Sequence, residues 1–133
     1  MSAARKQAEL FLRIAQRDRR AFGNLLATSS VDDFPVAAFL AQQSVEKSLK
    51  AVLCLAGIAY DHTHDLDALA QQVLSVGLDL PVSLEDLFRL TPYAVAFRYD
   101  DAPLPLVTPE QARTIVDRCV IWCETHMASS QWL

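Results

Sequence analysis

Four side chains that could bind a ligand or take part in a reaction lie along one side of an expected helix. Their spacing is i, i+4, i+7 and i+11, and they are Gln43, Lys47, Lys50 and Cys54. Two lysines about one turn apart repel each other unless a negative group lies nearby, and either Glu46 or a bound phosphate could supply it. The same pattern is typical of a solvated helix face, on which lysine stems run past apolar residues to water. Residue types alone leave these alternatives open.

A second candidate for anion binding is Arg98, within Phe97-Arg98-Tyr99-Asp100. A guanidinium can bind phosphate through two hydrogen bonds, stack on the Tyr99 ring, or satisfy the last carbonyls of a helix. The sequence does not choose among these roles.

The densest group of potential metal ligands is His62, His64, Asp65 and Asp67. Their spacing matches no zinc motif, and the Glu-x-x-His pairs of di-iron bundles do not occur. The chain also has no G-x-S-x-G nucleophile motif, no P-loop and no dinucleotide fingerprint. We therefore expect neither a bound metal nor a cofactor.

Composition favours one helical domain over residues 1–133. Hydrophobic residues make up 52% of the 133 residues and charged residues 21%, which suits a buried core. Only three glycines occur, which favours long helices over a turn-rich β fold. No apolar run is long enough to span a bilayer, and the first residues lack the apolar core of a signal peptide, so a cytoplasmic location is expected. The three cysteines are expected to be reduced and buried.

Charge is unevenly distributed along the chain. The net charge of −4 disfavours indiscriminate binding to nucleic acid. Residues 1–20 carry six basic and two acidic side chains, a local charge of +4, whereas residues 61–101 carry eight acids and two arginines, a local charge of −6. One end of the domain could meet an anionic partner, or both regions could be solvated helix faces.

Periodic apolar positions and capping residues define the helices that would position these side chains. We expect helices over about 3–27, 34–56 and 65–76, a fourth from 83 that is kinked or broken at Pro92 and resumes over 93–99, and a fifth from 108. Thr63 is expected to cap the third helix, and Thr108 with Gln111 forms a capping box for the last. Short connections between the helices predict an all-α, antiparallel, up-and-down bundle of four to five helices.

Three blocks taken together resemble the HEPN family, the nucleotide-binding domain of higher eukaryotes and prokaryotes. The blocks are 38–51, Thr63-His64-Asp65-Leu66, and 93–99, and their order and spacing match. The resemblance implies a bundle of four to five helices, commonly a homodimer, that binds nucleotide or RNA. It also implies a minimal nucleotidyltransferase as a possible partner in a toxin–antitoxin pair. The candidate nucleotide- or anion-binding residues are Gln43, Lys47, Lys50, His64, Asp65, Arg98 and Tyr99.

The resemblance also bears on catalysis. RNases of this family carry an arginine followed four to six residues later by histidine. Arg98 matches the arginine, but Ala-Pro-Leu-Pro occupies 102–105, and the next histidine is His126 on another expected helix. The departure favours a non-catalytic subunit that binds a nucleotide or a nucleotidyltransferase. The alternatives are a metal-independent RNase with a displaced base, for which His64 would have to lie near Arg98, and a purely structural module.

Overall fold

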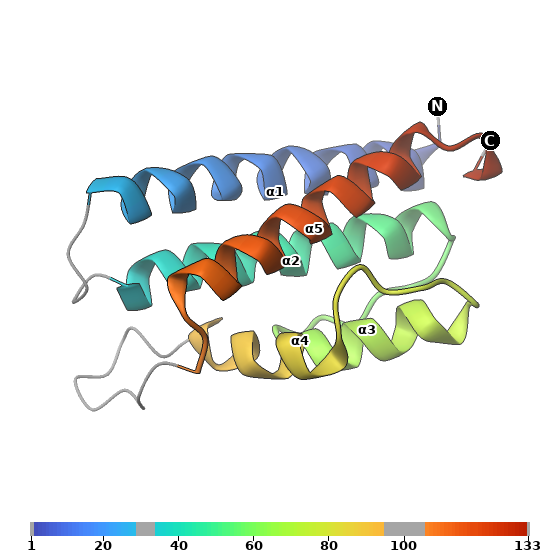
Figure 1. The fold of residues 1–133 in the computed structure, drawn as a ribbon. Helices are drawn as coiled ribbons and strands as arrows, with labels where there is room; N and C mark the ends of the chain where they lie inside the picture. Colours follow the sequence, from blue (N-terminus) through green and yellow to red (C-terminus); the bar gives the residue numbers. More distant parts are fainter. Residues whose placement is uncertain (1, 29–33, 95–105, 133) are drawn as a thin grey trace.

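The computed structural model describes residues 2–28, 34–94 and 106–132, and within these ranges it contains helices and no strand (Figure 1). The helices are α1 (Ala3–Thr28), α2 (Phe34–Leu55), α3 (Leu66–Ser75), α4 (Leu84–Leu90), η2 (Thr91–Ala94), α5 (Pro109–Ala128) and η4 (Ser130–Trp132), where η denotes a 3₁₀ segment. The predicted all-α bundle is confirmed.

Local sequence determines where most of these helices begin. Ser83 caps α4 by accepting a hydrogen bond from the Asp86 backbone N–H. Thr108 and Gln111 form the predicted capping box at the start of α5. The expectation for α3 was wrong in detail: its N-cap is Asp65, whose side chain accepts from the Asp67 N–H. The Thr63 hydroxyl instead accepts a hydrogen bond from the backbone N–H of Asp65, the N-cap residue itself.

Two helix ends also follow from the sequence. Gly57, at φ +73°, ends α2, and the following Ile58 N–H donates to the Leu53 carbonyl, as in a Schellman motif. The fourth helix changes at Thr91, just before Pro92, from an α-helix to the 3₁₀ segment η2. The predicted continuation over 95–99 lies outside the described residues.

The helices form two layers around α2. Figure 1 shows α1 antiparallel to α2, with α5 packed across both, and α3 and α4 on the other side of α2. The segment 56–65 runs back along α2, where the Gln42 side chain donates to the His64 carbonyl. Gln72 of α3 donates to the Ala59 carbonyl and so joins the same segment to α3. As a result α3 begins beside the middle of α2 and runs in the same direction as α2.

The core is apolar except along α2 and at Asp18 of α1. Buried residues from every α-helix pack around Val45, Leu49 and Leu53. All three cysteines are free and buried, as predicted. Five polar residues of α2 are buried as well, and they are Gln42, Ser44, Glu46, Ser48 and Lys50. None of the described helices combines the length and apolar character needed to cross a membrane. The unusual feature of the bundle is therefore its polar central helix.

Candidate functional site

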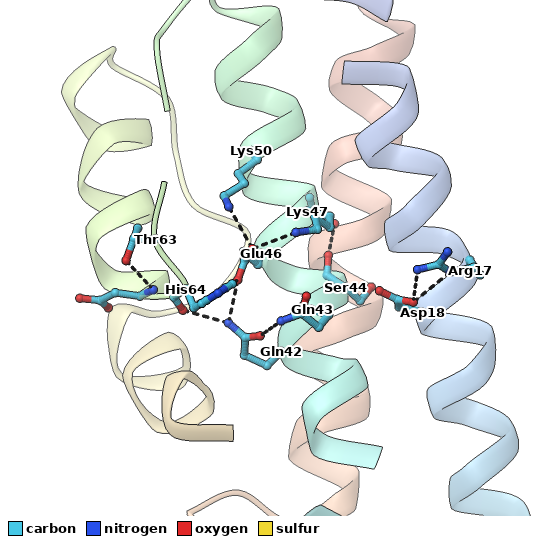
Figure 2. A network of polar contacts seen from close by, with 12 residues as sticks. Arg17, Asp18, Gln42, Gln43, Ser44, Glu46, Lys47, Lys50, Thr63 and His64 are labelled. Carbon is cyan, nitrogen blue, oxygen red and sulfur yellow. Dashed lines mark hydrogen bonds and ion pairs between the residues drawn. The ribbon is translucent and has the colours of Figure 1, made fainter. Parts of the chain in front are cut away.

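Glu46 is the centre of the buried polar contacts of α2. Its side chain is fully buried, and its two oxygens are shared among four partners (Figure 2). Oε1 accepts from Gln42 Nε2 at 3.2 Å and lies 2.8 Å from His64 Nδ1. Oε2 accepts from Lys47 Nζ and Lys50 Nζ, both at 3.0 Å. A carboxylate has about four acceptor positions, so this one is saturated.

The pKa of Glu46 shows which effect dominates. Burial alone raises this pKa, because it removes water from the charged form. Hydrogen bonds from His64, Lys50 and Lys47 outweigh burial and lower the pKa to about 2. Glu46 is therefore a fully ionised, buried carboxylate at neutral pH, which is tolerable only because it is paired.

The two lysines contact Glu46 and aromatic rings. Lys50 is only 7% exposed, and its Nζ lies 5.5 Å from the centre of the Tyr60 ring. The Lys47 side chain is 19% exposed, with Nζ 5.9 Å from the centre of the Phe11 ring. The interpretation of this stripe as a solvated face is wrong for Lys50, because the returning segment 56–65 covers it. The interpretation in which Glu46 supplies the negative charge is confirmed.

Gln42 belongs to the same cluster, although it was not among the predicted site residues. Its Nε2 donates both to Glu46 and to the His64 carbonyl, the latter at 2.9 Å, while its Oε1 accepts from Gln43 Nε2 at 2.7 Å. Gln43, a predicted site residue, thus contacts Glu46 only through Gln42. The i, i+4 spacing of Gln42 and Glu46 was the available signal.

His64 is the exposed member of the cluster. Its side chain is 66% exposed, whereas Glu46 is fully buried. Because an ionised carboxylate only accepts hydrogen bonds, Nδ1 of His64 carries the hydrogen toward Glu46. Among the described residues, the second ring nitrogen, Nε2, has no hydrogen-bond partner. The neighbouring Asp65 is occupied as the N-cap of α3.

We call the set Gln42, Gln43, Glu46, Lys47, Lys50 and His64 the Glu46 network. Its two lysines and one carboxylate give it a charge of +1 with neutral His64 and +2 with protonated His64. Of the predicted site residues, Arg98 and Tyr99 lie outside the described part of the chain. Within the described ranges, no three His, Cys, Asp or Glu side chains gather as a metal site would require.

A smaller polar group joins α1 to α2 next to this network (Figure 2). The Ser44 hydroxyl donates to the Ala15 carbonyl of α1 at 2.7 Å. Asp18, which interrupts the apolar stripe of α1, is 6% exposed and accepts from Nε and Nη2 of Arg17, each at 3.2 Å. The Ser44–Ala15 hydrogen bond links α1 to the helix that carries Glu46, whereas the Arg17–Asp18 pair lies within α1.

Comparison with known proteins bears out the resemblance. Neither the curated proteins nor the solved structures yield a match to the chain. A family model, described as the HEPN domain, matches residues 8–123, which includes α1 to α5 almost completely and the whole Glu46 network. The chain therefore belongs to the HEPN domain family.

Proposed function

We propose that this chain is a HEPN binding subunit that takes a phosphate group of a nucleotide or RNA at His64 and Lys47. One observation carries the proposal: the Glu46 network has an excess of positive charge, and it presents one oriented imidazole to solvent. HEPN domains are associated in general with nucleotide or RNA functions and with dimers. We further propose that the chain acts as a homodimer with a minimal nucleotidyltransferase, in a pair of the toxin–antitoxin type.

The geometry supports a contact through His64 more strongly than one through the lysines. Lys50 is buried and already bonded to Glu46, so a ligand could reach it only by displacing the segment 56–65. His64 needs no such movement, and when protonated its Nε2–H can donate to a phosphate oxygen. The partly exposed Lys47 adds positive charge from the same helix face.

Binding can be tested by titrating the purified chain with ATP, AMP and a short single-stranded RNA. His64→Ala should weaken binding at least tenfold. His62→Ala is the matched control, because His62 is also an exposed histidine of this segment but contacts the Tyr60 ring and not Glu46. Equal losses in both variants, or no binding by the wild type, would overturn the phosphate contact.

The partner proposal needs a separate experiment. A nucleotidyltransferase encoded beside this chain should co-purify with it when both are co-expressed, and the complex should elute as one species in gel filtration. Independent elution of the two proteins would contradict the pair, whatever the outcome of the nucleotide titration.

The contact between Glu46 and His64 also favours a second candidate, a metal-independent endoribonuclease. A buried carboxylate that holds the Nδ1 hydrogen leaves Nε2 as the basic nitrogen, which is the form needed to accept a proton from a ribose 2′-hydroxyl. This function predicts RNA cleavage in the presence of EDTA, with a loss of 10² or more in both His64→Ala and Arg98→Ala. Nucleotide binding without any cleavage by the wild type would exclude it.

A further inference from the structure

A polar hollow of about 500 Å³ lies between α1 and α5, away from the Glu46 network. Three arginines line it, Arg19, Arg20 and Arg113, together with Phe22 and Gly23. Phe22 is almost fully buried. The volume is that of a site for a small molecule, and the charged lining indicates a polar one.

The two ends of the hollow differ in charge. Cross-helix contacts close one part of it: Gln16 donates to Glu124 at 2.9 Å, and the Arg19 Nε donates to Asp117 at 2.9 Å. Since α1 and α5 are antiparallel (Figure 1), Arg113 lies beyond Asp117 toward the start of α5. The hollow thus has two carboxylates, each already hydrogen-bonded, in one part and Arg113 beyond them.

Arg20 and Arg113 are the available cations of this hollow. Neither guanidinium has a hydrogen-bond or ion-pair partner in the described part of the chain, whereas Arg19 is bonded to Asp117. Both are exposed, Arg20 on α1 and Arg113 on α5. Two free guanidiniums suit the paired oxygens of a phosphate better than a single lysine would.

Gly23 leaves the α1 side of the hollow without a side chain at that position. Gly57 and Gly77 have φ values of +73° and +81°, so the backbone requires glycine at both, but Gly23 lies in the interior of α1 with no such requirement. A Cβ added at Gly23 would meet no heavy atom within 4 Å. Glycine weakens a helix interior relative to alanine, and no packing contact inside the chain explains it here. The missing side chain leaves the hollow open.

We infer that this hollow binds a small phosphate monoester that carries hydroxyl groups, such as a sugar phosphate or a nucleoside monophosphate. The phosphate would lie at Arg20 and Arg113, and the hydroxyls would donate to Glu124 or Asp117. The two carboxylates disfavour a polyanion along the whole hollow, because its further phosphates would meet them. The inference does not depend on the Glu46 network or on its proposed ligand.

The test is an amide NMR titration of the full chain with ribose 5-phosphate and with AMP. Saturable shifts confined to α1 and α5 are expected with at least one of these two phosphates. Ribose and adenosine, which lack the phosphate, should cause no such shifts. Shifts with ribose 5-phosphate indicate a sugar-phosphate site, and shifts with AMP alone show that the base is also needed. Shifts only around α2 and 56–65 would belong to the His64 site and would overturn this inference.

Three variants make the test specific. Gly23→Leu should fill the hollow and abolish the α1 and α5 shifts, and Arg113→Gln should weaken binding at least tenfold. Arg118→Gln removes the same charge from an exposed position of α5 that does not line the hollow, and it should bind as the wild type does. If the leucine variant fails to fold, Gly23→Ala replaces it in the titration. This smaller change should weaken binding measurably. Equal losses in Arg113→Gln and Arg118→Gln would show nonspecific attraction and overturn the site.

Discussion

The Glu46 network and the hollow between α1 and α5 use similar residues in opposite ways. In the network, a fully buried carboxylate accepts from two lysines and a histidine, and every acceptor position is filled. In the hollow, two guanidiniums have no partner among the described residues, and a glycine keeps the space open. Burial forces charges to be paired, while an open surface can leave them available.

The comparison separates residues that hold the fold together from residues that can bind a ligand. The network fixes the returning segment 56–65 to α2 and thereby places the start of α3. Its exposed end, His64, and the partly exposed Lys47 are the members that a ligand can reach without displacing the segment 56–65. The polar side chains of the hollow are joined by partly exposed pairs, so these side chains can be changed with smaller effects on stability.

The largest effect is expected for Glu46→Gln. The amide keeps the shape of the side chain but removes the charge, and it leaves two ammonium groups near each other without a counter-charge. Breaking a buried ion pair by removing one partner costs about 3–5 kcal/mol, so urea unfolding should show a loss of that size.

Glu85→Gln is the matched control for this variant. Glu85 also pairs with a cation at i, i+4, Arg89, but the pair lies on the surface, with side chains 70% and 39% exposed. Its loss should cost less than about 1 kcal/mol. Similar losses in the two variants would contradict the central role given to Glu46.

The same carboxylate predicts a pH dependence. Its pKa is about 2 in the fold and has an ordinary value of 4.5, so the unfolded chain binds the proton first as the pH falls. The stabilisation is therefore complete above about pH 4.5 and is lost toward pH 2. The difference in unfolding free energy between wild type and Glu46→Gln should have its full value at pH 7 and should shrink between pH 4.5 and 3. A constant difference down to pH 3 would exclude this depressed pKa.

The sequence predicted the helices better than the site. Ser83 and Thr108 cap their helices through neighbouring residues, so local chemistry was enough. The environment of Lys50 could not be predicted in this way, because it depends on the segment 56–65 folding back over α2. Gln42 was missed for the same reason, since one of its partners, the His64 carbonyl, is 22 residues away in the chain.

A smaller effect, of opposite sign, is expected at Gly23. Gly23→Ala should stabilise the chain by about 0.5–1 kcal/mol, because alanine favours the helix and its Cβ meets no neighbour. Gly57→Ala and Gly77→Ala should instead destabilise it by about 1 kcal/mol, since both positions have positive φ. Thermal unfolding of the three variants measures the contrast. A destabilising Gly23→Ala would show that the glycine serves packing and would remove its support for the hollow.

The smallest effect is expected for the ion pair that crosses the hollow. Arg19 and Asp117 are bonded at 2.9 Å, but their side chains are 34% and 41% exposed, so water and salt screen the attraction. Asp117→Asn should cost about 0.2–1 kcal/mol at low salt, and the loss should decrease further in 1 M NaCl. The loss caused by Glu46→Gln should change little with salt, because its charges are buried. A salt-independent loss in Asp117→Asn would mean that the pair is shielded from solvent, and the distinction between a buried network and an open hollow would then fail at this position.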